Sequence, residues 1–114
     1  LQVLDPGIGF AKDLDGNLSL LKGVMGRRLR TDGGLLDGFP MLLGPSRKGF
    51  IGKLIGEESD PERRDFGTVA ACVLGSLGGS SERKLGISGT ILRVHNVKAV
   101  KDASVIMEAI LNAK

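Results

Sequence analysis

Residues 39–50 read FPMLLGPSRKGF, and this stretch decides the fold that the sequence predicts. Its first five residues form an apolar run of strand length, which ends at Gly44 and Pro45, a pair that interrupts regular secondary structure. A serine, an arginine and a lysine follow at positions 46–48, and apolar residues then recur at helical spacing. Cationic side chains and free backbone N–H groups are therefore expected at the carboxyl end of a strand, where they can bind an anion.

The rest of the chain alternates predicted strands with predicted helices. Apolar runs predict two further strands, at residues 1–4 and 90–94, and a helical pattern follows each strand. The helix starts are marked by capping residues or proline, at Asp15 or Asn17, at Asp60 with Pro61, and at Asn96. Alternating strands and helices imply a parallel sheet with right-handed crossovers. The predicted fold class is α/β.

Small residues distinguish the predicted helix that follows Asp60. An apolar stripe that begins at Phe66 is expected to face inwards, and Gly75 and Ser76 are small enough to let the helix approach a sheet closely. On either side of the central region, the glycine-rich segments 26–38 and 78–89 predict loops.

Polar side chains stand at the ends of all three predicted strands. Asp5 follows the first, Lys48 the second, and Arg93 and His95 lie near the end of the third. Because ligands of parallel α/β folds bind beyond the carboxyl ends of the strands, Asp5, Lys48 and Arg93 are expected to converge on one pocket. Two alternatives remain open: Asp5 is a turn former only, or His95 is structural. Arg93 lies within an apolar strand, where a buried guanidinium needs a partner.

Composition narrows the possible functions. The 114 residues are 41% hydrophobic and 25% charged, which is typical of a globular chain. Aromatic residues make up only 4%, and the net charge is +3, so a nucleic-acid surface built on base stacking is not expected. No apolar run is long enough to predict a membrane span. The single Cys72 and single histidine exclude a Cys/His metal site and favour a reducing, intracellular compartment.

Three stretches resemble signatures of the dihydropteroate synthase family, in the family's order. They read LDPGIGF at 4–10, GPSRK at 44–48 and RVHNV at 93–97. Between them, GTVAA at 67–71 resembles the helix that precedes the family's last strand. The resemblance covers most of the chain, and it makes residues 1–114 a partial pterin-binding domain.

The resemblance implies a fold and a reaction. The fold would be the C-terminal three βα units, strands six to eight, of a (β/α)₈ TIM barrel, and hence an incomplete barrel. The enzyme would be a transferase of folate biosynthesis, which joins 7,8-dihydropterin-6-ylmethyl diphosphate to 4-aminobenzoate. It would release diphosphate and 7,8-dihydropteroate, with Mg²⁺ as helper and the metal's protein ligand outside this chain. Family members form homodimers, and some are fused to a pterin pyrophosphokinase domain; the location would be the mitochondrial matrix if plant-like, otherwise the cytoplasm.

The resemblance also implies roles for the strand-end residues. Asp5 would accept hydrogen bonds from the pterin ring, and Lys48 would contact pterin acceptor atoms, with Gly44 allowing close approach. Arg93 and His95 would hold the diphosphate as it leaves, where negative charge develops. Lys48, Arg93 and His95 would thus be the catalytic residues.

A second substrate pocket, for 4-aminobenzoate, would be bordered by Phe10, Ser46 and Arg47.

Two features depart from the family. The family's five preceding strands are missing, as expected of a fragment that opens at Leu1 inside an apolar run. The ten residues 80–89 intervene before the last strand, as a surface loop or as a translated intron. The competing functions are a pterin-binding methyltransferase and a truncated product without activity.

Overall fold

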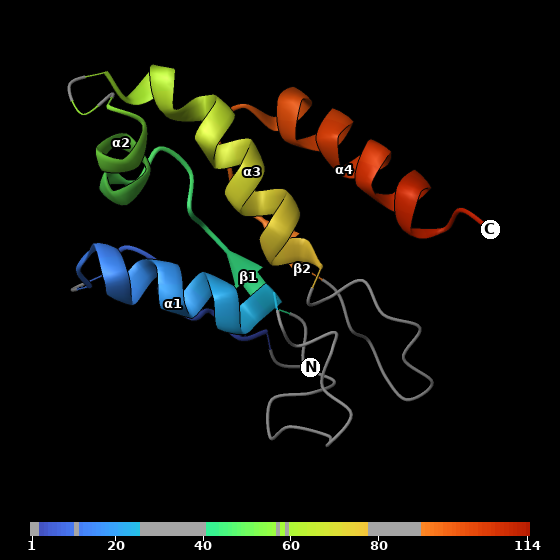
Figure 1. Cartoon of the computed structure of the whole chain (residues 1–114), viewed down its shortest axis with the longest axis horizontal. Coiled ribbons are helices and arrows are strands. Elements are labelled where there is room, and N and C mark those ends of the chain that lie inside the picture. The colour runs from blue at the N-terminus through green and yellow to red at the C-terminus, as the bar shows by residue number, and fades with distance from the viewer. Residues whose placement is uncertain (1–2, 11, 26–40, 57, 59, 78–89) are drawn as a thin grey trace.

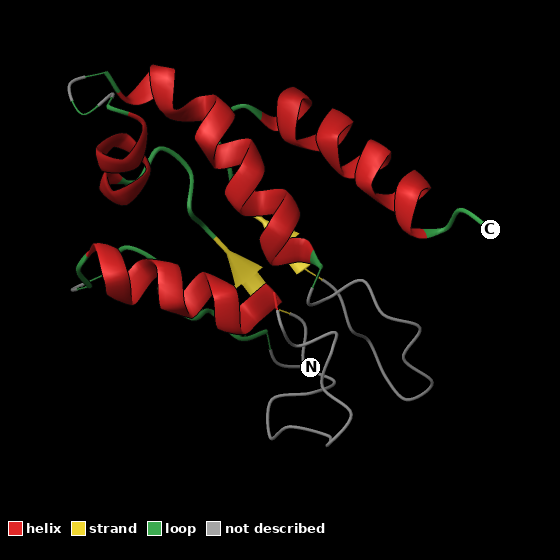
Figure 2. Cartoon of the chain, viewed as in Figure 1, coloured by secondary structure: helices red, strands yellow, loops and turns green. Residues whose placement is uncertain are grey.

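The computed structural model describes the chain in six segments, residues 3–10, 12–25, 41–56, 58, 60–77 and 90–114. These contain, in chain order, α1 (Leu14–Met25), β1 (Met41–Leu43), α2 (Gly49–Ile55), the 3₁₀ helix η2 (Pro61–Arg64), α3 (Asp65–Ser76), β2 (Thr90–Leu92) and α4 (Val97–Leu111). Figure 2 shows helices and short strands in one body. The predicted loops at 26–38 and 78–89, and the beginnings of two predicted strands at 1–2 and 39–40, lie outside the described residues.

The sheet is parallel, as predicted. β1 and β2 pair in the register Met41–Thr90, Leu42–Ile91 and Leu43–Leu92. On the other side of β1, Leu4 makes an isolated parallel bridge to Met41, and the Leu42 N–H donates to the Leu4 carbonyl at 2.8 Å. The three predicted strands therefore lie side by side in chain order, and their carboxyl ends point the same way.

The helix α3 is the centre of the helical layer. It contacts α1, α2 and α4; in the view of Figure 1, β1 lies between α1 and α3, and β2 lies behind the C-terminal end of α3. At Gly75 an added Cβ would lie 2.6 Å from Cδ1 of the fully buried Leu43, so α3 packs directly on β1. The small residues predicted to allow this approach do so.

The predicted inward face of α3 was wrong at Phe66. That side chain is 90% exposed, whereas the buried positions of the helix are Thr68, Cys72, Gly75 and Ser76. Close packing against the sheet favours small side chains, and a phenylalanine does not fit between two such closely spaced backbones. The apolar periodicity therefore described the helix correctly and its buried face incorrectly.

The predicted cap of α1 was also wrong, while the others are confirmed. Asp13, not Asp15 or Asn17, precedes the helix, and its carboxylate accepts from the Gly16 N–H at 2.7 Å. Asp60 accepts from Glu62 N–H at 3.1 Å, and Asn96 accepts from Ala99 N–H at 3.1 Å. Within the described residues, no helix has the length and apolarity needed to cross a membrane.

Candidate functional site

Three loops meet beyond the carboxyl ends of the strands. The loop that follows Leu4 runs to Phe10, the β1 loop covers residues 44–48, and the β2 loop begins at Arg93. Side chains of the second and third loops cross to their neighbours, so the loops form one surface. These contacts bring the three strand-end loops together, with Lys48 at the first loop and Arg93 at the second.

The first loop is a glycine turn held by Asp5. The Asp5 carboxylate accepts from the Gly7 N–H at 2.8 Å, and Lys12 Nζ donates to the Gly7 carbonyl at 2.7 Å. The Asn17 carboxamide, buried in α1, accepts from the Gly9 N–H at 2.7 Å and fixes the loop to the helix. Asp5 is exposed and its carboxylate holds this turn; among the described residues no hydrogen bond or ion pair joins it to Lys48 or Arg93.

Lys48 joins the first and second loops. It directly precedes α2, and its Nζ donates to the Ile8 carbonyl at 2.9 Å. The same ammonium lies 4.3 Å from the centroid of the Phe10 ring, at cation–π distance. A Cβ at Gly9 (φ 87°) would lie 2.6 Å from the Lys48 Cδ, so only glycine leaves room for the lysine side chain.

Ser46 and His95 join the second and third loops. The His95 N–H donates to Ser46 Oγ at 3.0 Å, and Ser46 Oγ lies 2.6 Å from His95 Nδ1. Because Oγ already accepts from the backbone, its hydroxyl proton is available to donate to Nδ1 of a neutral imidazole. In the tautomer that accepts at Nδ1, the ring carries its proton on Nε2 and presents it as a donor.

Arg93 lies against Gly44. Its backbone N–H continues the β ladder to the Leu43 carbonyl at 2.9 Å, one residue beyond the end of β2. A Cβ on Gly44 would lie 3.1 Å from Arg93 Nη2, so the absence of a side chain at Gly44 leaves room for the guanidinium. The expectation of a buried guanidinium was wrong: Arg93 is exposed, because it stands past the strand end rather than within it.

Arg47 is held by a carboxylate that the sequence did not identify. Its Nε donates to Asp65 Oδ1 at 2.8 Å and its Nη2 to Asp65 Oδ2 at 3.2 Å, a two-pronged ion pair with both side chains mostly buried. The hydrogen bonds from Arg47 lower the pKa of Asp65 against the opposing effect of desolvation, and a hydrogen bond donated by Asn96 adds to the lowering. The sequence does show Asp65 as an acidic residue in the first turn of α3, but the sequence pattern does not indicate that Arg47 is its partner.

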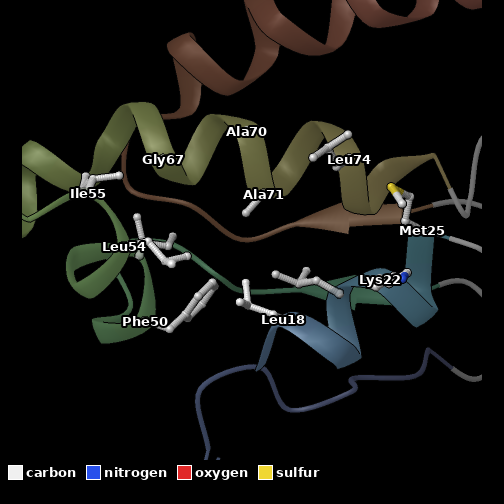
Figure 3. Close-up of a pocket in the computed structure, with 12 residues that line it drawn as sticks. Leu18, Lys22, Met25, Phe50, Leu54, Ile55, Gly67, Ala70, Ala71 and Leu74 are labelled. Carbon is white, nitrogen blue, oxygen red and sulfur yellow. The ribbon is translucent and has the colours of Figure 1, made fainter. Parts of the chain in front are cut away.

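An apolar cavity of about 380 Å³ lies elsewhere, between α1, α2 and α3. Figure 3 shows Leu18, Phe50, Leu54 and Leu74 along it, with Lys22 at one end. It offers almost no hydrogen-bonding groups, so it does not suit a polar substrate. In the described segments no group of three or more His, Cys, Asp or Glu side chains could hold a metal ion.

Comparison with known proteins places the chain in a family. The family described as pterin binding enzyme matches residues 2–83. The dihydropteroate synthase of Synechocystis sp. is 39% identical over 109 residues, 95% of this chain and 32% of the relative. That of Bacillus subtilis is 39% identical over 110 residues, 96% of this chain and 32% of the relative. The mitochondrial folate synthesis bifunctional protein of Arabidopsis thaliana is 34% identical, over 98% of this chain and 19% of the relative.

Solved structures agree with the sequence relatives. A dihydropteroate synthase from Xanthomonas albilineans in complex with 7,8-dihydropteroate matches with a TM-score of 0.76 and 35% identity, over 98% of this chain and 37% of that one. The same enzyme with 4-aminobenzoic acid gives a TM-score of 0.76 and 36% identity, over 98% and 36% of the two chains. This chain spans about a third or less of the length of the curated relatives named above. Since the family match covers most of its residues and its α/β structure matches solved members, the chain belongs to the pterin binding enzymes.

Proposed function

We propose that this chain is the pterin- and diphosphate-binding part of a dihydropteroate synthase. The observation that carries the proposal is the joining of three strand-end loops by cationic side chains. Lys48 reaches the first loop at Ile8, and Arg93 lies on Gly44 of the second. A pterin diphosphate has hydrogen-bonding ring edges and a polyanionic tail, and this surface supplies groups for both.

The order of the elements supports strands six to eight of a (β/α)₈ barrel. The bridge at Leu4, β1 and β2 lie side by side in chain order and parallel, and each is followed by a helix. Consecutive parallel strands with helices on the outside are the repeating unit of that barrel. Its active site lies at the carboxyl ends of the strands, where the three loops meet.

The pterin ring would bind between Asp5 and Lys48. The Asp5 carboxylate would accept from ring N–H groups, and a ring acceptor atom would replace the Ile8 carbonyl as partner of Lys48 Nζ, which now donates there at 2.9 Å. Arg93 occupies the space that a side chain at Gly44 would need, so the glycine would let the pterin ring approach the guanidinium closely.

The reaction forms a C–N bond and breaks a C–O bond at the pterin methylene. The amine of 4-aminobenzoate attacks the methylene carbon, the diphosphate leaves with the electron pair, and the amine nitrogen loses a proton. Negative charge grows on the leaving oxygen, so donors held in place there lower the barrier. The Arg93 guanidinium and the His95 Nε2–H are proposed as those donors.

The second substrate, the metal and the partners complete the proposal. Phe10, which is 62% exposed, and Ser46 would border 4-aminobenzoate. Mg²⁺ is proposed by relation to the family alone, with its protein ligand outside this chain. A homodimer and a fused pyrophosphokinase domain are proposed by relation to the family, whose plant members are named bifunctional and mitochondrial. A mitochondrial matrix location would follow for a plant-like protein, and a cytoplasmic one otherwise.

Calorimetric titration with 7,8-dihydropterin-6-ylmethyl diphosphate and Mg²⁺ tests the proposal. We expect micromolar binding that weakens about tenfold or more in Lys48→Ala and in Arg93→Ala, since hydrogen bonds to charged groups are worth that much. Lys101→Ala is the matched control, because it removes an exposed cation from α4, outside the three loops. Absence of binding by the unmodified chain, or equal losses in all three variants, would refute the assignment.

A further inference from the structure

Arg47 adopts an unusual backbone conformation. Its φ is 56°, and within the described segments it is the one non-glycine residue with positive φ. An L-residue with a long side chain rarely occupies this left-handed region, because its Cβ crowds the backbone. Such a conformation persists only where surrounding contacts hold it.

Those contacts come from the turn η2 and the start of α3. The Arg47 N–H donates to Thr68 Oγ1 at 3.0 Å, and Arg64 Nη1 donates to the Arg47 carbonyl at 2.8 Å. Asp65 holds the guanidinium through two hydrogen bonds, at 2.8 and 3.2 Å. The backbone N–H, the backbone carbonyl and the side chain of Arg47 therefore all bind one five-residue segment.

We propose that Arg47 is a positioning residue and that Arg64, Asp65 and Thr68 form a clamp that holds its turn. This rests on the proposed function, and it changes the role of Arg47 from a border of the 4-aminobenzoate pocket to a support of the site. The hydrogen bonds of the clamp go to Arg47, and Asp65 also interacts with Asn96 and His95 of the third loop. The clamp residues act through the shape of the turn.

The neighbours of Arg47 show what the shape achieves. Ser46 Oγ contacts His95 in the third loop, and Lys48 Nζ contacts Ile8 in the first. Two residues separated by a single position thus reach two different loops. The left-handed residue between them sets their directions, so releasing Arg47 is expected to disturb both contacts together.

The ion pair also removes Arg47 as a free charge. The Arg47 side chain is 23% exposed and the Asp65 side chain 20%, and the pair's hydrogen bonds lower the pKa of Asp65. Asp65 is therefore ionised at neutral pH and balances the arginine. An incoming carboxylate would have to break this pair to bind Arg47, whereas Lys48 and Arg93 form no ion pair within the described segments.

Amide hydrogen exchange at Arg47 tests the clamp without any ligand. We expect Thr68→Val to speed exchange of the Arg47 N–H about tenfold, the effect of one lost hydrogen bond, and Thr68→Ser to restore it to within about threefold. Asp102→Asn is the control, because it breaks the exposed Lys98–Asp102 ion pair on α4. Unchanged exchange in Thr68→Val would overturn the proposal.

Binding of 7,8-dihydropteroate tests the role of Arg47. Glycine adopts positive φ readily and alanine does not, so Arg47→Gly is expected to bind about threefold or more tightly than Arg47→Ala. A direct substrate contact predicts equal losses in the two variants, and that result would overturn the positioning role. If the unmodified chain does not bind the compound, the proposed function fails, while the exchange measurement still decides whether the clamp exists.

Discussion

At the scale of single residues, the Arg47–Asp65 pair makes stability depend on acid. The pKa of Asp65 is lowered from 3.8 in the folded chain, chiefly by the hydrogen bonds from Arg47. A carboxyl with a lowered folded pKa stabilises the fold above its unfolded pKa, and this contribution disappears as the pH falls through the folded value. The free energy of unfolding should therefore fall more steeply below about pH 4 in the unmodified chain than in Asp65→Asn.

Urea unfolding between about pH 2 and pH 7 measures this difference. The comparison variant is Asp102→Asn, whose parent ion pair is 86% and 64% exposed at its two side chains and should contribute little. Its pH dependence should match that of the unmodified chain. Parallel curves for the unmodified chain and Asp65→Asn would show that the pair does not stabilise the fold.

At the scale of elements, two glycines in helices give opposite predictions. Gly75 of α3 is buried, and a Cβ there would lie 2.6 Å from Leu43 Cδ1. Overpacking costs about 1–3 kcal/mol, and the gain in helix propensity of about 1 kcal/mol does not offset most of that range. Gly23 of α1 has nothing within 4 Å of its added Cβ, so alanine should stabilise the chain there by about 0.5–1 kcal/mol.

Urea midpoints of Gly75→Ala and Gly23→Ala check the pair together. The first should fall and the second should rise, with similar slopes, because neither substitution changes the surface exposed on unfolding much. Equal stability of the two variants would mean that α3 can move away from β1 without loss. The packing of α3 on the sheet would then be looser than the contact indicates.

Local signals explain which elements were predictable. Asp60 with Pro61 and Asn96 stand next to their helices, and their caps were predicted correctly. Asp13 was missed because several polar residues precede α1, and propensity alone does not choose between them. The buried face of α3 was missed because its close approach to β1 is a tertiary property, which a period of apolar residues does not contain.

Some features of the candidate site could likewise be predicted from local sequence signals, and others could not. The strand-end loops were predictable, since apolar runs that stop at glycine and a charged residue are visible in the sequence. Arg93 was predicted inside the last strand, but that strand ends at Leu92, two residues before the end of its apolar pattern, so Arg93 lies in the loop that follows. The pair of Arg47 and Asp65 joins positions 18 apart through a turn, and the sequence offers no spacing rule for that distance.

At the scale of the whole molecule, the main apolar cluster is small and is formed by the first loop, α1, β1 and α2. The buried apolar residues include Ile8, Leu43 and Phe50, whereas Val105 and Ile110 of α4 are 58% and 69% exposed. A chain with so much exposed apolar surface is expected to have limited stability by itself. Binding at the strand ends should then raise its stability measurably, because a ligand that binds only the folded chain shifts the unfolding equilibrium.

Cys72 reports that shift. It is fully buried in α3, and burial raises the pKa of its thiol to about 11, so iodoacetamide should label it at about pH 8 only when the chain opens. With 7,8-dihydropteroate at about 100 times its dissociation constant, labelling should slow about a hundredfold. In Lys48→Ala the same ligand concentration should slow labelling far less, since fewer molecules are bound.

Labelling of the free chain at the rate of an unfolded thiol would contradict the burial of Cys72. Ligand-independent labelling, in a chain that calorimetry shows to bind, would mean that α3 opens without disturbing the three loops.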